Sequence, residues 1–242
     1  MKKTIIMAML MAAAVTGSAA DPAAPEYKKL PAGERAPVLM LGDSMMRLLG
    51  KALEKEFKKN DIEAKAFSSL GSGLARLDAF DWYAKIKSLL DETHAKTVIV
   101  TLGANDRQTL LDEKGNMFEY GTPGWRTEYS TRVGKAMDTL ISNGTQHVIW
   151  LMLPDMKERT HQDYAQLANV IYAEQAAVES RKDKVVLYDM RPLLTKKPGT
   201  YSSFIMSPQG EALNVRDADG VHLTSDGSKL VAKALLSTFW LD

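Results

Sequence analysis

The 242-residue sequence contains no cysteine. Disulfides, thiol nucleophiles, cysteine-based zinc sites and a lipoprotein anchor are therefore excluded. The sequence also lacks an excess of charge of either sign, because 31 lysine and arginine residues stand against 30 aspartate and glutamate residues. A protein that binds nucleic acid needs a basic face to neutralise phosphates, so we expect no nucleic-acid partner. With 45% hydrophobic residues, the composition is that of a soluble globular domain.

The N-terminal segment has no apolar run long enough to cross a bilayer, which takes about 20 residues. Its apolar run, residues 5–15, follows two lysines and precedes a stretch of small residues that ends at Ala20. This order is typical of a secretory signal peptide. We therefore expect residues 1–20 to be a signal peptide, cleaved after Ala19 or Ala20. The mature protein is then expected to be periplasmic or secreted, without a transmembrane anchor.

The remaining chain divides into a short leader and one domain. Residues 21–35 are rich in proline, alanine and charge and lack an apolar period, so we interpret them as a leader or linker. From residue 36 onward, short apolar runs alternate with longer amphipathic stretches, which predicts a parallel sheet covered by helices on both faces. We predict one α/β domain over residues 36–242, a three-layer sandwich with a central, mostly parallel five-stranded sheet. The predicted strands are residues 38–41, 62–67, 97–102, 147–153 and 185–188, and the predicted helices are residues 48–57, 82–90, 129–141, 164–178 and 225–239.

In such sheets, ligands bind at the carboxyl ends of the strands, so the residues that follow each predicted strand are the most informative. After the first strand, Gly42-Asp43-Ser44 leads directly into a helix. A serine in this turn exposes its hydroxyl group and has its backbone N–H at the positive end of the helix, which suits a nucleophile whose reaction forms an oxyanion. An ordinary helix-capping role for Asp43 or Ser44 explains the same residues equally well.

The next two strand ends carry glycine and amide groups. After the second strand, Gly71 and Gly73 allow backbone N–H groups to approach a ligand closely, although a plain flexible turn fits as well. A dinucleotide-binding fingerprint fails, because Arg76 stands where that pattern needs glycine. After the third strand, the side-chain amide of Asn105 can donate to a developing negative charge. The alternative is that Asn105 or Asp106 caps a helix.

Near the C-terminus, Asp219 precedes His222 by three residues. A carboxylate at this spacing can accept a hydrogen bond from Nδ1 of the histidine and leave Nε2 free as a general base. Asp217 competes with Asp219 for the same role. A calcium-binding loop does not fit, because Val221 and His222 stand where such a loop needs oxygen ligands. The joint position of all these residues at strand ends favours a catalytic site over separate structural roles.

Four segments resemble the four sequence blocks of the SGNH hydrolase superfamily, also called the GDSL esterase/lipase group: residues 42–44, 71–73, 103–106 and 219–222. Their order and spacing match over nearly the whole expected mature chain, and the first block reads GDSM in place of GDSL. The chain has no G-x-S-x-G elbow, which argues against the α/β-hydrolase fold. The resemblance implies the flavodoxin-like SGNH fold and a reaction that needs no metal or cofactor.

The resemblance also implies a role for each matching residue. Ser44 would be the nucleophile, His222 the general base and Asp219 the residue that orients it. The oxyanion hole would combine the backbone N–H of Ser44, a glycine N–H of the second block and the side chain of Asn105. By the spacing of the blocks we prefer Gly73 over Gly71 as that glycine. The reaction would be a two-step acyl transfer through an acyl-enzyme.

The substrate is a hypothesis that rests partly on analogy. A long non-periodic stretch between residues 107 and 127 contains aromatic residues that either line the pocket or simply fix the loop. We assign Asp43, Arg107 and Trp125 to substrate contact. No broad apolar lid is evident, so a long-chain lipase is disfavoured, and export favours a short acyl ester, most simply O-acetyl, on a carbohydrate or cell-envelope glycan. An O-acyltransferase and a glycan-binding protein with little turnover are the alternatives, and the sequence predicts no oligomeric state.

Overall fold

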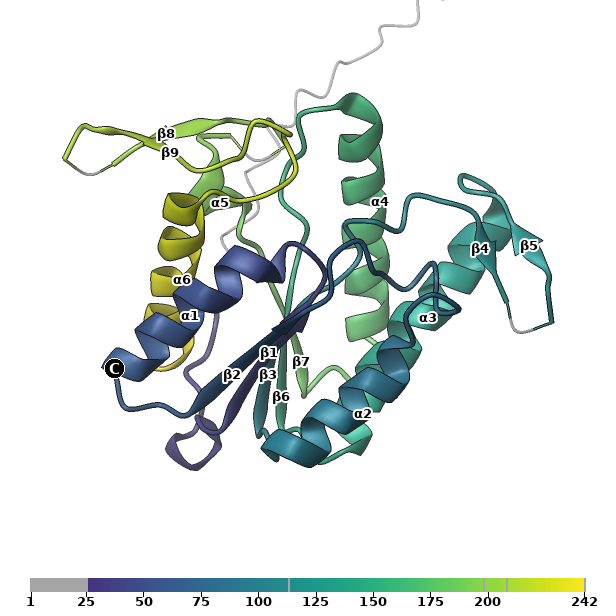
Figure 1. Ribbon diagram of the computed structural model, residues 1–242, viewed down its shortest axis with the longest axis horizontal. Helices are drawn as coiled ribbons and strands as arrows, with labels where there is room; N and C mark the ends of the chain where they lie inside the picture. The colour runs from purple at the N-terminus through teal and green to yellow at the C-terminus, as the bar shows by residue number, and fades with distance from the viewer. Residues whose placement is uncertain (1–25, 113, 198, 208, 242) are drawn as a thin grey trace, which may run out of the picture.

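The computed structural model describes residues 26–112, 114–197, 199–207 and 209–241. A five-stranded sheet occupies the centre of the molecule, and helices cover both of its faces (Figure 1). The strand order is β2-β1-β3-β6-β7, and every pair of neighbouring strands is parallel. The predicted α/β sandwich is confirmed. The strands of this sheet are β1 (Val38–Gly42), β2 (Ala64–Ser68), β3 (Thr97–Thr101), β6 (His147–Leu151) and β7 (Val185–Tyr188).

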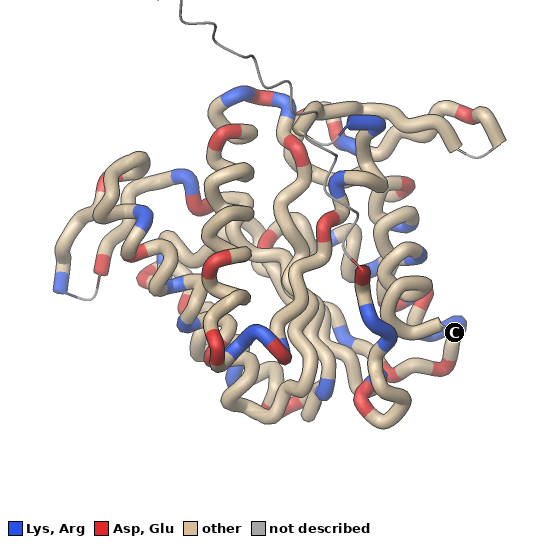
Figure 2. The backbone as a smooth tube through the Cα atoms, turned by 180° about the vertical axis from the view of Figure 1, so that it is seen from behind, with Lys and Arg blue, Asp and Glu red and all other residues tan. Residues whose placement is uncertain are grey.

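Two hydrophobic clusters lie between the sheet and its helices. One joins the sheet to α1 and α6, and the other joins the opposite face to α2, α3 and α4. The strands β1, β3, β6 and β7 carry no lysine, arginine, aspartate or glutamate, which is the pattern of strands buried on both faces. Charged residues of both signs are instead spread over the helices and loops (Figure 2). The helices are α1 (Met46–Lys59), α2 (Trp82–Thr93), α3 (Pro123–Ser142), α4 (Arg159–Ala176), α5 (Arg191–Leu194) and α6 (Ser225–Phe239), with a 3₁₀ turn η1 at Ala32–Glu34.

The structure also contains features that the sequence pattern does not predict. Two short antiparallel hairpins lie outside the main sheet: β4 (Leu110–Leu111) with β5 (Met117–Phe118), and β8 (Phe204–Met206) with β9 (Ala212–Asn214). The first contacts α3 and the second contacts α6 (Figure 1). Helix α3 begins at Pro123, six residues before the predicted start, because the Thr122 side chain caps it by accepting a hydrogen bond from the N–H of Trp125.

Part of the expected leader packs on the domain. The ring of Tyr27 lies 5.1 Å from that of Tyr188 and 5.5 Å from that of Phe239, and the side chain of Leu30 is buried. Within the described ranges, no helix is both long and apolar enough to span a membrane. The expected signal peptide and residues 21–25 of the leader lie outside the described residues. The domain boundary at residue 36 stays a prediction.

Candidate active site

The turn after β1 and the loop before α6 meet at the carboxyl edge of the sheet. The Oγ atom of Ser44, two residues past the end of β1, lies 2.7 Å from Nε2 of His222. Nδ1 of the same ring lies 2.5 Å from Oδ2 of Asp219. Residues that are 178 positions apart in the chain thus form one continuous hydrogen-bonded line of serine, histidine and carboxylate. This is the arrangement in which a serine hydroxyl can transfer its proton to a histidine.

Asp219 is held as a carboxylate. Its Oδ1 atom accepts hydrogen bonds from the backbone N–H groups of Val221 and His222, at 2.8 and 3.0 Å. Partial burial by itself would raise the pKa of Asp219, but the hydrogen bonds from the ring and backbone of His222 and the backbone of Val221 lower it to about 2. Asp217 does not compete for this role, because one of its carboxylate oxygens accepts from the N–H of Ala218 while its own N–H binds the carbonyl of His222.

Arg216 fixes the shape of the histidine loop, and sequence reasoning missed it. Its guanidinium group is buried and donates to the carbonyl oxygens of Asp155, Gly220 and Val221. Burial lowers the pKa of Arg216 to about 10, which still leaves it charged at neutral pH. A lone arginine before an Asp-rich turn gives no sequence signal of this role, because its partners are backbone carbonyls.

Among the described residues, the backbone N–H groups of Ser44 and Gly73 have no hydrogen-bond acceptor and could bind an anion. The N–H groups of Asp43, Met45 and Met46 all donate to protein oxygens, but that of Ser44 has no acceptor in the described part of the chain. The same holds for Gly73, whose neighbour Leu74 donates to a carboxylate. Free N–H groups beside a serine nucleophile are the components of an oxyanion hole.

Asn105 lies against the same turn. Its Nδ2 atom donates to the carbonyl oxygen of Ser72 at 2.9 Å, which uses one of its two amide hydrogens and leaves the other available. The N–H of Gly71 also has no acceptor among the described residues, but Gly71 is exposed whereas Gly73 is buried beside the loop that carries Asn105. The structure therefore brings Ser44, Gly73, Asn105, Asp219 and His222 to one edge of the sheet.

Residues 37–238 match the sequence family described as "Protein of unknown function (DUF459)". The chain belongs to this family. The matched range covers all five strands of the central sheet and every residue of the site above. No curated protein matches the sequence.

A solved structure shares the fold of this DUF459 protein. A protein described as a GDSL-like lipase, from Parabacteroides merdae, is 11% identical, with a TM-score of 0.51, and the match covers 88% of this chain and 98% of that one. This likeness confirms the SGNH fold that the sequence blocks imply. Two further structures have a TM-score of 0.47: the lipase Lip_vut3 from a goat rumen metagenome, 15% identical over 85% of this chain and 99% of that one, and the periplasmic domain of a lipopolysaccharide acetyltransferase from Salmonella ser. Paratyphi A, 12% identical over 83% and 80%.

Asp43 and Trp125 do not reach the surface of the DUF459 chain. Both side chains are fully buried. The carboxylate of Asp43 accepts only backbone N–H groups, and the indole of Trp125 donates to the carbonyl of Gln108 and stacks on Tyr129. A substrate that arrives from solvent touches neither of them, so their assignment to substrate contact is wrong. The sequence pattern puts Asp43 at a strand end and Trp125 in a loop, but it does not show whether either side chain faces the solvent or the interior.

Arg107 is exposed, and its guanidinium group lies 5.8 Å from the centre of the Tyr120 ring. Its role in substrate contact stays a prediction. Ser44 and His222 line a small depression together with Met45, Arg47, Leu48 and Leu223. Arg47 is exposed there and, within the described residues, has no acidic partner. The depression is small and has a cation at its rim.

Proposed function

We propose that this protein is a serine esterase that removes short acyl groups, most simply O-acetyl, from a carbohydrate or cell-envelope glycan. The observation that carries the proposal is the line of hydrogen bonds from Ser44 through His222 to Asp219, at 2.7 and 2.5 Å. The free N–H groups of Ser44 and Gly73, in the turns after β1 and β2, support the proposal, because such a reaction needs donors of this kind.

In the first half of the proposed reaction, the Oγ atom of Ser44 attacks the ester carbonyl carbon while Nε2 of His222 takes the hydroxyl proton. Asp219 stabilises the imidazolium ion through Nδ1. The negative charge that develops on the carbonyl oxygen is stabilised by the N–H groups of Ser44 and Gly73 and by the amide of Asn105, a contribution of about 10²–10³ in rate for each donor. The alcohol leaves with the proton from His222, and the acyl group stays on Ser44.

In the second half, His222 takes a proton from water and the resulting hydroxide attacks the acyl-enzyme. The bond between the acyl carbon and Oγ of Ser44 then breaks as His222 returns its proton to Oγ, which releases the acid and restores the serine. An acceptor hydroxyl group in place of water would make the enzyme an acyltransferase, with the same first half. The depression beside Ser44 is small, which favours a short acyl group over an enclosed long chain. Arg47 and Arg107 are the exposed residues that we propose contact the acyl carrier.

The test is a panel of 4-nitrophenyl esters, from acetyl to octanoyl, followed by acetylated xylan and acetylated peptidoglycan. We expect highest activity on the acetyl esters. Ser44→Ala should lower kcat by at least about 10³-fold, whereas Ser88→Ala, which changes an exposed serine on α2, should leave it unchanged. Full activity in Ser44→Ala would exclude the proposed mechanism. Comparison of acetate release with acetyl transfer to added glycan distinguishes hydrolysis from transfer, and tight glycan binding without either reaction would favour a binding protein.

The proposal includes export. Residues 1–20 would be removed as a signal peptide, and residues 36–242 would form the catalytic domain. The intact mass of the protein recovered from the periplasm or the medium of a bacterial expression host tests this directly. A mass that begins near residue 20 or 21 supports export, and a full-length protein retained in the cytoplasm contradicts it.

A further inference from the structure

The loop after β2 that carries Gly73 is held through both its backbone N–H groups and its backbone carbonyl groups. We call residues 72–75 the Gly73 loop. Asp106, whose side chain is fully buried, accepts hydrogen bonds from the N–H groups of Leu74 and Ala75, each at 2.9 Å. Because Asp106 occupies the two N–H groups that follow Gly73, it leaves the N–H of Gly73 as the free donor of this part of the loop.

Arg132 holds the carbonyl side of the same two residues. Its NH1 atom donates to the carbonyl oxygens of Leu74 and Ala75, each at 2.9 Å, and its Nε atom pairs with Glu128 on the same helix at 2.7 Å. The side chain is 4% exposed. A buried anion and a buried cation thus bind opposite edges of one short stretch of backbone. Charge-assisted hydrogen bonds of this kind are shorter and stronger than neutral ones.

The carboxylate of Asp106 lies so close to Gly73 that a larger residue would not fit at position 73. A Cβ atom at residue 73 would lie 2.0 Å from Oδ1 of Asp106, so glycine is required for the carboxylate to approach this closely. The hydroxyl group of Tyr129 donates to Oδ2 of Asp106 at 3.1 Å. Asn105, the residue before Asp106, donates to Ser72. The turn after β3 therefore holds the Gly73 loop on both sides of Gly73.

We propose that Asp106 and Arg132 are positioning residues for the esterase reaction, because together they fix the Gly73 loop so that the N–H of Gly73 faces the developing oxyanion. This inference rests on the proposed function. Neither residue touches the substrate, since both side chains are buried and their hydrogen bonds are made to the protein. Hydrogen-bond donors that are fixed before the reaction contribute most to transition-state stabilisation, so a looser loop should slow the chemical step more than it weakens substrate binding.

Burial and hydrogen bonding have opposite effects on the pKa of Asp106. The pKa of Asp106 is raised by burial, and the N–H groups of Ala75 and Leu74, the hydroxyl of Tyr129 and the nearby charge of Arg132 offset this rise only in part. The carboxylate is thus stabilised by the same contacts that fix the loop. Loss of any one of them should release the loop in part.

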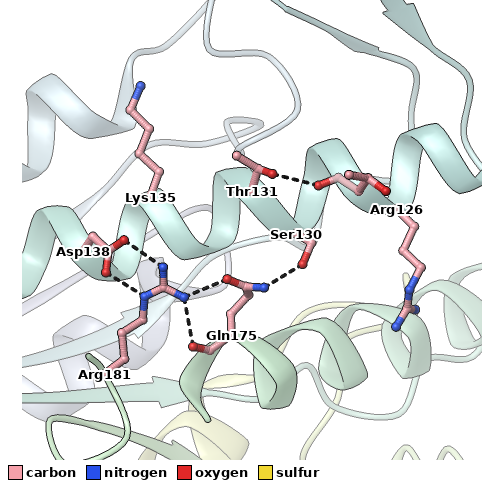
Figure 3. Close-up of a pocket in the computed structure, with 8 residues that line it drawn as sticks. Arg126, Ser130, Thr131, Lys135, Asp138, Gln175 and Arg181 are labelled. Carbon is pink, nitrogen blue, oxygen red and sulfur yellow. Dashed lines mark hydrogen bonds and ion pairs between the residues drawn. The ribbon is translucent and has the colours of Figure 1, made fainter. Parts of the chain in front are cut away.

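Arg181 provides a matched control (Figure 3). Arg181 is also buried. It donates to both carboxylate oxygens of Asp138 on α3 and to the backbone and side-chain oxygens of Gln175 near the end of α4. It makes no hydrogen bond to the Gly73 loop. Its removal should therefore destabilise the fold in a similar way without changing the proposed oxyanion hole.

The experiment compares Arg132→Ala with Arg181→Ala on 4-nitrophenyl acetate, at a temperature at which circular dichroism shows both to be folded. We expect Arg132→Ala to lower kcat by about 10–10²-fold with KM changed less than about threefold. Added guanidinium ion at low millimolar concentration should restore part of the lost kcat. Arg181→Ala should keep kcat within about twofold, with no response to guanidinium. Equal losses of kcat in the two variants would overturn the positioning role.

Asp106→Asn and Tyr129→Phe keep the inference testable if Arg132→Ala does not fold. The first removes one acceptor for the loop and should lower kcat by about 10-fold or more, and the second removes only the supporting hydroxyl and should have a smaller effect of the same kind. Ser44→Ala is measured beside them. If Ser44→Ala is inactive while Asp106→Asn keeps the wild-type kcat, the positioning role alone is wrong. If Ser44→Ala keeps its activity, the proposed function is wrong, and the positioning role with it.

Discussion

Oδ2 of Asp43 accepts a hydrogen bond from the N–H of Gly103 at 3.0 Å and so ties the turn after β1 to the turn after β3. The same oxygen accepts from Ala104 at 3.0 Å, and Oδ1 accepts from Met45 at 2.9 Å. Asp106 makes the corresponding connection between the turns after β3 and β2. Two buried carboxylates thus link the three turns that present Ser44, Gly73 and Asn105.

The burial of Asp43 predicts a pH-dependent stability. Burial raises its pKa to about 7, against the lowering effect of the N–H groups of Met45, Ala104 and Gly103. The unfolded chain releases this proton near pH 4, the ordinary value for aspartate. Between about pH 4 and pH 7 the folded protein therefore holds a proton that the unfolded chain has lost, and its stability falls as the pH rises through this window, by at most about 1.4 kcal/mol per pH unit.

Urea unfolding at pH 4.5, 5.5, 6.5 and 7.5 measures this effect in the wild type and in Asp43→Asn. The variant should be less stable throughout, because an amide cannot replace both acceptor oxygens, but its free energy of unfolding should change less across the window. Parallel curves for the two proteins would show that Asp43 does not titrate there.

Part of the candidate site could be predicted from the sequence, because some of its side chains lie at strand ends. Ser44 and Asn105 follow apolar runs whose carboxyl ends meet at one edge of a parallel sheet, whereas His222 lies in the loop before α6 and was found through its spacing from Asp219. Asp43 and Trp125 show the limit of this reasoning, because burial depends on which side of the turn or helix a residue faces. Neither the alternation of strands and helices nor the spacing of blocks contains that information.

The residues that support the site were not predictable for a different reason. Arg132 and Arg216 both bind backbone carbonyl oxygens, and those oxygens are present whatever the local sequence is. The start of α3 at Pro123 was missed because its first turn carries Trp125 inside a stretch without apolar period. The strands β1, β3, β6 and β7 were found because each contains an uninterrupted apolar run, whereas β2 contains Lys65 and its pattern is less clear.

Asp219→Asn should lower kcat by about 10²–10⁴-fold while substrate binding changes little. The pKa of Asp219 is lowered to about 2 by the hydrogen bonds from His222 and Val221, which outweigh the raising effect of burial. The stability that this carboxylate contributes is therefore fully present above about pH 4 and is lost only as the pH falls towards 2.

Stopped-flow hydrolysis of 4-nitrophenyl acetate at pH 7 measures kcat for the Asp219→Asn variant, with Asp217→Asn as its matched control. A similar loss in both variants would contradict the pairing of Asp219 with His222.

Tyr27→Ala should destabilise the protein by about 2 kcal/mol, because the ring packs on Tyr188 and Phe239 and its hydroxyl accepts a hydrogen bond from the N–H of Asp189. Lys28→Ala changes an exposed neighbour and should have no effect. Urea unfolding measures both, and kcat should be unchanged because the partners of Tyr27, which are Tyr188, Phe239 and Asp189, lie outside the candidate site. A stability equal to that of the wild type would mean that the segment before residue 36 does not contribute to the folded domain.

Gly73→Ala should lower kcat by about 10–10²-fold, because the added Cβ atom would lie 2.0 Å from Oδ1 of Asp106 and must displace either the carboxylate or the loop. Either movement changes the direction of the Gly73 N–H without altering Ser44 or His222. The control is Gly33→Ala, since a Cβ atom at residue 33 would meet nothing within 4 Å. Labelling of Ser44 by a fluorophosphonate gives a second measurement, because the phosphoryl oxygen of the reagent occupies the oxyanion position. The labelling rate should fall with kcat in Gly73→Ala, and a normal labelling rate with normal kcat would assign the oxyanion contact to another N–H, with Gly71 as the first alternative.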